Sequence, residues 1–275
     1  MALNITPVEN HRGRETGVLV YPVYSRRSKG LSVGINLYPD KKQCLFNCPY
    51  CEVFPFATNA VFSLEQMEND LHCAIAAAQE QNIPIKDICF SGNGEPSLSH
   101  HFPEALRIAA SVRDKAAPSA ALVLITNGTG LLQPQIFSLL KDAASGSIEL
   151  DIWLKLDAGT PEWYKKMNRS NIQFDELTNK IKELAVCAPV TIQTMLCMIK
   201  GSSPPPDEKQ AWEQLTLELA KSKKVRKVQI YGKARSAPED PFASALPASY
   251  LEERADSLRG VFSEKGITAP VEIYL

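Results

Sequence analysis

The feature that most constrains this 275-residue chain is a repeated alternation of strand-like and helix-like segments from about residue 31 to the end. Apolar runs predict strands at 31–38, 85–90, 121–126, 148–156, 190–198, 228–231 and 271–274. Apolar residues with helical spacing predict helices around 64–78, from 102 onward, and around 133–144, 174–184, 212–219 and 251–262. Strand–helix–strand units join parallel strands, so about six such units predict an α/β fold, a partial (β/α)6-type TIM barrel. No G-x-G-x-x-G motif follows a strand, which argues against a dinucleotide-binding sheet.

The barrel is expected to occupy residues 31–275 as a single domain, since 44% hydrophobic residues suffice for one large core. Residues 1–30 are expected to be an N-terminal extension, with 1–16 loosely held. Within the extension, 17–24 is β-prone but contains Pro22, which limits it to an edge or flanking strand. Proline-rich segments at 203–206 and 237–247 predict the longest loops.

Composition excludes several classes of protein. The net charge of −1 provides no global basic field for nucleic acid. Seven cysteines, an odd number with uneven spacing, do not form a secreted disulfide framework. The first residues lack the apolar core of a signal peptide, and no run of about 18 apolar residues occurs. We therefore expect a soluble protein of the cytoplasm, without membrane association.

Three cysteines follow the first expected barrel strand in a C-x3-C-x2-C spacing, Cys44, Cys48 and Cys51. Thiolates so close in one loop can reach a single metal centre, and sulfur ligands favour iron–sulfur clusters, zinc or copper(I). A [4Fe–4S] cluster usually takes four cysteines, so three would leave one iron open, as a catalytic metal requires. Zinc stays open as an alternative, with a fourth ligand among His72, Cys73, His100 and His101.

Polar residues also follow the next expected strands. The stretch from Gly92 to Glu95 comes after the second strand, and glycines there allow a ligand to approach the backbone closely. Thr126 and Asn127 end the third strand. Lys155 and Asp157 end the fourth, and Gln193 lies within the fifth. Polar side chains that end apolar strands cost stability unless something uses them, and barrels place their chemistry at these strand ends.

The cysteine spacing resembles C-x3-C-x-Φ-C, the signature of radical S-adenosylmethionine (SAM) enzymes, with Tyr50 as the aromatic residue. The resemblance implies a [4Fe–4S] cluster on the three cysteines and SAM on its open iron. It also implies that Glu95, with Gly94 in a motif resembling G-G-E-P, holds the methionine amino group of SAM. The remaining contacts implied are Gly92 and Asn93 beside that motif, Thr126, Asn127 and Asp157 for the ribose, Lys155 for the carboxylate, and Gln193 for the cofactor.

More narrowly, the stretches SRRSKGLSVGINL, CLFNCPYCE, FSGNGEPSLS, ITNG, LKLDAG, IQTM and VQIYGKAR resemble the Fe–S oxidoreductases related to wyosine synthase. That relative modifies a transfer RNA base and has further cysteines for a second cluster, whereas this chain has none before Cys44. The resemblance implies reductive SAM cleavage to a 5′-deoxyadenosyl radical that takes hydrogen from a small-molecule substrate. It also implies a one-electron donor such as flavodoxin or ferredoxin.

Alternatives stay open beside this hypothesis. The chain could modify transfer RNA, which would require a larger basic rim, or it could be a non-enzymatic interaction protein folded around zinc. Lys155 could be an interior lysine paired with an acid. The other cysteines, Cys73, Cys89, Cys187 and Cys197, are expected to be core residues.

Three arginines lie outside these motifs, namely Arg26, Arg27 and Arg235. We expect them near the loops that flank the barrel mouth, where the guanidinium fork suits a carboxylate or phosphate of an anionic substrate. The alternative is that each is a surface arginine paired with one of the 31 acidic residues.

Overall fold

The structure, a computed structural model, describes residues 17–146, 148–235, 237 and 242–275. Residues 1–16, expected to be loosely held, lie outside the described residues. The chain divides into two compact units. Unit 1 comprises Met1–Cys44, Val53–Thr126 and Ser145–Asp151, and unit 2 comprises Leu45–Glu52, Asn127–Ala144 and Ile152–Leu275.

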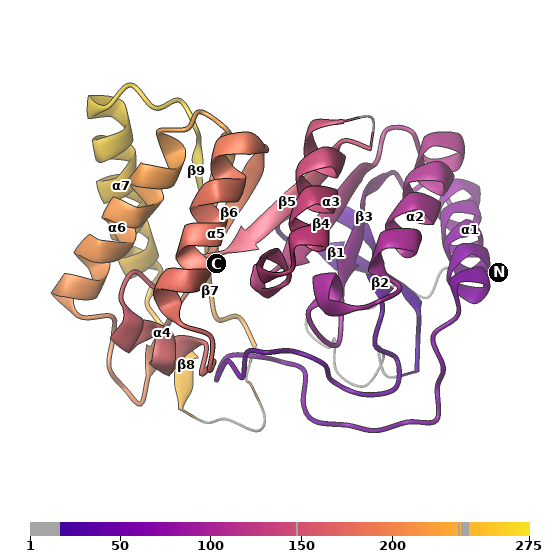
Figure 1. The fold of residues 1–275 in the computed structure, drawn as a ribbon, viewed down its shortest axis with the longest axis horizontal. Coiled ribbons are helices and arrows are strands. Elements are labelled where there is room, and N and C mark those ends of the chain that lie inside the picture. The colour runs from indigo at the N-terminus through magenta and orange to yellow at the C-terminus, as the bar shows by residue number, and fades with distance from the viewer. Residues whose placement is uncertain (1–16, 147, 236, 238–241) are drawn as a thin grey trace. The chain divides into compact units, whose positions relative to one another are not determined.

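Unit 1 contains four strands, two long helices and one short 3-10 helix (Figure 1). In chain order these are β1 Val20–Ser25, β2 Gly30–Asn36, α1 Leu64–Glu80, β3 Ile85–Ser91, η1 Pro96–Leu98, α2 Phe102–Ala116 and β4 Ala121–Thr126. The strand order is β1-β2-β3-β4, with β1 antiparallel to β2 and the rest parallel. The carboxyl ends of β2, β3 and β4 therefore lie along one edge of this sheet.

Local sequence explains where these helices begin. The hydroxyl of Ser63 accepts a hydrogen bond from the Gln66 N–H and caps α1, as its capping-box sequence predicts. Pro103 sits in the first turn of α2, where a missing N–H costs nothing. The two helices pack against each other, and each buries the apolar stripe expected of it.

Unit 2 follows the same alternation of strand and helix (Figure 1). In chain order its elements are η2 Thr129–Leu132, α3 Pro134–Ser145, β5 Leu150–Lys155, α4 Pro161–Met167, α5 Phe174–Cys187, β6 Val190–Ile199, α6 Pro206–Ala220, β7 Val225–Gly232, β8 Ala243–Ala245, α7 Ala248–Glu264 and β9 Val271–Tyr274. Strands β5, β6, β7 and β9 pair in parallel, while β8 pairs antiparallel with β6.

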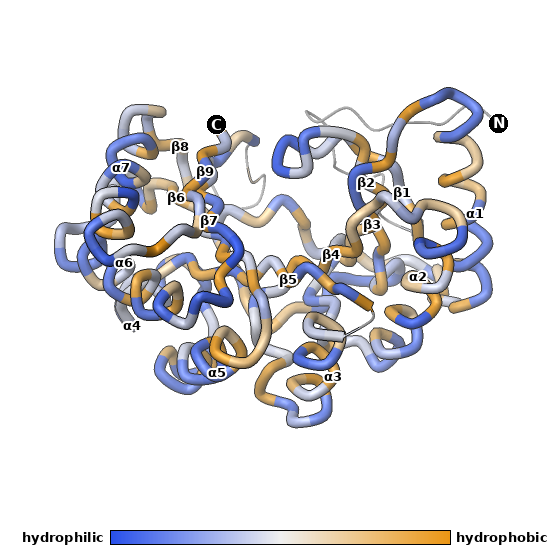
Figure 2. The backbone as a smooth tube through the Cα atoms, turned by 90° about the horizontal axis from the view of Figure 1, so that it is seen from above, coloured by the Kyte–Doolittle hydropathy of each residue, from blue (hydrophilic) through white to orange (hydrophobic). Residues whose placement is uncertain are grey.

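Hydropathy alternates along the helices, whose turns are hydrophobic on the packed side and hydrophilic elsewhere (Figure 2). The core strand β6 is buried at nine of its ten positions. No helix among the described residues is long and apolar enough to cross a membrane.

Every strand and long helix expected from the sequence is present. Among the described residues, four short elements were not expected, namely the 3-10 helices η1 and η2, the seven-residue helix α4 and the three-residue strand β8. The expected loop at 237–247 contains β8 in its described part, and the expected loop at 203–206 ends where Pro206 begins α6. Proline is common at the first position of a helix as well as in loops. The interpretation of 203–206 as a loop did not consider that Pro206 could begin a helix.

Candidate functional site

The carboxyl ends of β3 and β4 are joined through Glu95. Its side chain is 2% exposed, and Oε1 accepts hydrogen bonds from the Ser97 N–H (3.2 Å), the Ser97 hydroxyl (2.6 Å) and the Thr126 hydroxyl (2.6 Å). Glu95 thereby caps η1 and brings two residues of the predicted SAM site, Glu95 and Thr126, into contact. These donors hold the buried carboxyl group in one orientation, which suits it to contact a cationic partner.

The loop between β3 and η1 is hydrogen-bonded to the residue that precedes Cys44. The Gln43 N–H donates to the Asn93 carbonyl (3.1 Å), and the Glu95 N–H donates to the Gln43 carbonyl (2.8 Å). A Cβ at Gly94 would collide with that same carbonyl, so only glycine permits this pairing. The predicted glycine motif therefore fixes where the chain enters the cysteine loop.

Gly92 and Asn93 anchor the same loop to the end of β2. Gly92 has φ +109° and packs against Asn36. The backbone N–H of Asn93 donates to Asn36 Oδ1 (3.1 Å), and its side-chain amide donates to the Tyr38 carbonyl (3.2 Å). The Asn93 side chain thus organises the chain around the predicted site, and sequence reasoning had not given it this role.

The cysteine loop divides between the two units, with Cys44 in unit 1 and Cys48 and Cys51 in unit 2. All three cysteines are half-buried, and none of them is in a disulfide. The Cys51 N–H donates to the Cys48 carbonyl (3.0 Å), which closes one tight turn around these two cysteines. No three His, Cys, Asp or Glu side chains among the described residues form a ready-made metal cluster. The donor set nonetheless fits an iron–sulfur cluster, because three reduced thiols share one short loop.

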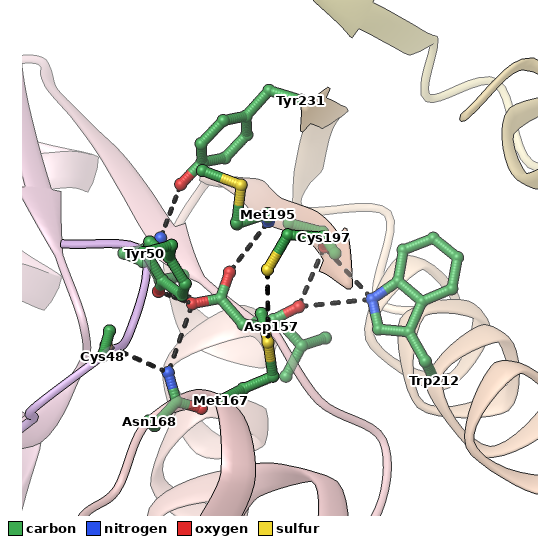
Figure 3. A network of polar contacts seen from close by, with 12 residues as sticks. Cys48, Tyr50, Asp157, Met167, Asn168, Met195, Cys197, Trp212 and Tyr231 are labelled. Atoms are coloured by element: carbon green, nitrogen blue, oxygen red, sulfur yellow. Dashed lines mark hydrogen bonds and ion pairs between the residues drawn. The ribbon is translucent and has the colours of Figure 1, made fainter. Parts of the chain in front are cut away.

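In unit 2, Asp157 lies at the centre of a buried polar network (Figure 3). Its Oδ1 accepts the Met195 N–H (2.9 Å), and its Oδ2 accepts the Tyr50 hydroxyl and the Asn168 amide (3.3 Å). Lys155 adds an ion pair at 3.2 Å. Burial and the adjacent Asp157 carboxylate raise the pKa of Tyr50 well above its usual value, so its hydroxyl remains a donor.

Lys155 is held between two aromatic rings. Its Nζ donates to the Tyr231 hydroxyl (2.5 Å) and lies over the Tyr50 and Tyr231 rings, 4.9 and 5.2 Å from their centroids. Burial alone would lower the pKa of Lys155, but the Asp157 carboxylate, together with Tyr231 and Cys48, outweighs burial and raises it. These contacts agree with the alternative noted from the sequence, in which Lys155 is an interior lysine paired with an acid.

Gln193 and Asn127 lie in unit 2 with partners of their own. Gln193 on β6 is fully buried and donates to Gln229 Oε1 on β7 (2.6 Å). Asn127 Oδ1 accepts from the N–H (2.9 Å) and hydroxyl (2.7 Å) of Thr129, which forms an Asx turn at η2. The cofactor contacts predicted for both residues stay predictions.

The expected position of two arginines is wrong. Arg26 and Arg27 form the turn between β1 and β2, so they lie at the amino end of β2, opposite to the edge that carries Glu95 and Thr126. The turn of the β1–β2 hairpin is separated from the carboxyl end of β2 by the length of that strand, roughly 20 Å for seven residues. Arg235, in unit 2, forms an ion pair with Glu52 at 2.7 Å, one residue after Cys51.

Sequence reasoning missed two residues that organise unit 2. Glu208 on α6 accepts the Gly159 N–H and the Thr160 hydroxyl, both at 2.6 Å, and so holds the loop after Asp157. Asn168 follows α4 and donates to Asp157 and to the sulfur of Cys48 (3.6 Å). An acid in the first turn of a helix usually serves the helix terminus, and the sequence around Asn168 has no periodic signal, so neither residue stood out.

Comparisons with known proteins find relatives that are described as UPF0026 proteins. A UPF0026 protein of Helicobacter pylori (strain J99) is 32% identical over 136 residues, which cover 47% of this chain and 41% of that protein. A UPF0026 protein of Synechocystis is 26% identical over 233 residues, which cover 79% of this chain and 76% of that protein. The match therefore spans less than half the length of the Helicobacter relative. No protein-family model matches the chain.

Solved structures show the fold. A radical SAM methyltransferase from Sphaerobacter thermophilus aligns with a TM-score of 0.62 at 12% identity, covering 89% of this chain and 66% of that one. Streptococcus suis SuiB bound to S-adenosylmethionine aligns with a TM-score of 0.66 at 12% identity, covering 88% and 50%. This likeness confirms the predicted fold class, the α/β fold of mostly parallel strands that radical SAM enzymes have. The resemblance to wyosine synthase stays a prediction.

Proposed function

We propose that the protein is a radical SAM enzyme that holds a [4Fe–4S] cluster on Cys44, Cys48 and Cys51. The observation that carries the proposal is the loop of three cysteines outside any disulfide, in a chain with the fold of radical SAM enzymes. Cys44, Cys48 and Cys51 would hold the cluster, which when bound would supply the electron for reductive cleavage of SAM and so the means to take a hydrogen atom from the substrate.

The residues of unit 1 would bind the methionine end and ribose of SAM. Glu95 would pair with the SAM ammonium group, which requires a buried anion held in place, and its contacts with Ser97 and Thr126 provide that. Gly92, Asn93 and Gly94 shape the backbone beside it. Thr126 would serve the ribose side.

The residues of unit 2 would serve the rest of SAM. Asp157 and Asn127 would face the ribose, and Lys155 would face the carboxylate. Tyr50, the aromatic residue of the cysteine motif, and Gln193 would complete the contacts. Support comes from burial, because such a density of polar side chains at strand ends costs stability that a ligand can offset.

The proposed substrate class rests on one residue, Arg235. Arg235 would contact a carboxylate or phosphate of a small anionic substrate after exchanging its partner Glu52. Electrons would come from a one-electron protein donor such as flavodoxin or ferredoxin.

The deciding experiment is anaerobic reconstitution with iron and sulfide. We expect close to four irons per chain, an EPR signal that SAM perturbs, and reductive cleavage of SAM to 5′-deoxyadenosine. Serine at Cys44, Cys48 or Cys51 should abolish cleavage, while Cys73→Ser, a matched control at an exposed thiol, should not. Stoichiometric zinc with no iron, or full cleavage by the triple serine variant, would refute the proposal.

A second test separates SAM binding from cluster binding. Glu95→Gln retains an oxygen that accepts from Ser97 and Thr126 but removes the charge. We expect SAM affinity to fall by roughly one to two decades, because a charge-assisted hydrogen bond contributes about 1.5–3 kcal/mol. Iron content should be unchanged. Equal SAM affinity in the variant and the wild type, measured by equilibrium dialysis, would exclude Glu95 from the ammonium site.

A further inference from the structure

We propose that Asn168 is a positioning residue of the cluster site. Its side-chain N–H donates to the sulfur of Cys48 and thereby raises the reduction potential of the bound cluster. This inference rests on the proposed function, since it requires that Cys48 ligate a cluster. It assigns a role to a residue that lies far from the cysteine motif in sequence.

The contact belongs to a buried group with two acceptors (Figure 3). Asn168 is 2% exposed, and its Nδ2 lies 3.6 Å from Cys48 Sγ and 3.3 Å from Asp157 Oδ2. An amide nitrogen carries two hydrogens, so one N–H is directed at each acceptor. Both hydrogens of this nitrogen are therefore used within the network.

The orientation of this amide follows from its neighbours. If the amide were flipped, its carbonyl oxygen would face the Asp157 carboxylate, and two acceptors would meet in a buried site. The Asp157 carboxylate thus forces the nitrogen toward itself and toward Cys48. Tyr50 and Lys155 fix Asp157 in turn, so the N–H that faces the sulfur does not depend on a metal.

The backbone around Asn168 brings the cysteine loop to the amide. The Asn47 N–H donates to the Asn168 carbonyl (2.9 Å), and the Phe46 ring meets the Tyr164 ring edge-on, with centroids 5.6 Å apart. The Asn168 N–H donates to the Tyr164 carbonyl and ends α4. Two contacts beside Cys48 therefore hold the sulfur within reach of the donor.

The electrostatic consequence has a definite sign. Reduction adds negative charge to a cluster and its thiolate ligands, and hydrogen bonds to those sulfurs stabilise the more negative state. A donor in a buried site is stronger than the same donor in water. The Asn168 amide therefore favours the reduced cluster, and its loss lowers the potential.

The test is a redox titration of reconstituted variants followed by EPR. Asn168→Leu retains the branched shape of the side chain without a donor, and Asn168→Ala removes both. We expect about a tenfold lower ratio of reduced to oxidised cluster at a fixed potential in each variant, a shift of ~59 mV for a one-electron couple. Iron content should match that of the wild type, so the shift is not a loss of cluster.

The matched control is Thr178→Val. Thr178 lines the same cavity as Asn168 and Asp157, and its hydroxyl bonds the carbonyls of Phe174 and Asp175 within α5. Valine has nearly the same shape, so a general packing effect would appear here too. We expect the wild-type potential in this control. A shift as large as that of Asn168→Leu would assign the effect to packing and overturn the inference.

A measurement on the wild-type protein tests the inference even if the Asn168 variants do not fold. With asparagine labelled by ¹⁵N at the side chain, pulsed EPR of the reduced cluster should show a weak ¹⁵N coupling. An absent coupling, or unchanged potentials in both Asn168 variants with cluster intact, would overturn the inference alone. Wild-type protein that binds no iron would overturn the proposed function and this inference with it.

Discussion

Glu208 shows how one side chain can carry pH dependence without touching the reaction. Burial raises its pKa to about 7, while its hydrogen bonds with Thr160 and Gly159 oppose the rise. It is 3% exposed and holds the loop that carries Asp157. A carboxyl group with a raised pKa in the folded state binds its proton more tightly there than in the unfolded chain.

The first residue-scale prediction follows from that sign. Glu208 contributes stability that is fully present below pH 4.5, its usual pKa, and lost as the pH rises through about 7. Glu208→Gln, which can retain both hydrogen bonds, should therefore gain stability relative to the wild type as the pH rises through this window, by up to roughly 3 kcal/mol. Urea unfolding of the apo protein between pH 4.5 and 8 measures the difference.

A second variant separates the proton from the hydrogen bond. Thr160→Val removes a donor to Glu208 and leaves the carboxyl group in place. It should lower stability, and because the lost hydrogen bond held the pKa of Glu208 down, the fall of stability with rising pH should extend to a higher pH than in the wild type. Parallel stability curves for Glu208→Gln and the wild type would show that Glu208 does not titrate in this range.

Gly159, beside this acid, illustrates a constraint that is visible only in the structure. A Cβ at Gly159 would collide with the backbone of Trp212 on α6. Trp212 in turn donates from its indole N–H to the Leu156 carbonyl (3.2 Å) and to the Thr194 hydroxyl (3.1 Å). The loop after β5 is thus held by α6 on both sides of Asp157.

At the scale of elements, β1 is a component of the unit 1 sheet. It pairs with β2 over six residues, and Val20, Tyr21 and Val23 are buried. The Tyr21 ring covers Gly34, where any side chain would collide with it, and the Tyr21 hydroxyl bonds Ser91 (2.7 Å). The strand expected to flank the fold therefore completes the core of this unit.

An element-scale prediction follows. A chain that starts at residue 30 lacks β1 and leaves the backbone N–H and C=O groups along one side of β2 unpaired, a template for association with other chains. We expect this truncation to be recovered as aggregate, measured by light scattering and gel filtration. A chain that starts at residue 17 retains β1 and serves as the control. Equal dispersion of the two truncations would contradict the prediction.

The described elements that the sequence did not reveal are all short, the helix α4 and the strand β8 among them. A helix of seven residues, such as α4, spans two turns and shows no full apolar period, so its signal is Thr160 as N-cap followed by Pro161. The three residues of β8 pair with β6. They lie in a segment whose prolines had led us to expect a loop. Tertiary contacts create both elements, and local propensity does not.

At the scale of the whole molecule, the sequence predicted the fold class and the elements well because strand and helix periods are local. It also located Glu95, Thr126 and Asp157 at the ends of strands. It could not predict which side chains meet, since the contacts of Asn168 with Cys48 and Asp157 join positions 120 and 11 residues apart. The sequence also could not predict that β1 pairs antiparallel with β2. This pairing puts Arg26 and Arg27 at the amino end of β2, at the edge of the sheet opposite to Glu95 and Thr126.

The contacts of Phe46 with Tyr164 and of Asn47 with Asn168 also bear on how the proposed cluster would be taken up. In small zinc domains the chain is disordered until the metal arrives, and much of the binding free energy orders the ligands. Here side-chain packing and backbone hydrogen bonds hold the turn around Cys48 without a metal. On the proposed function, the chain would therefore fold first and receive the cluster second.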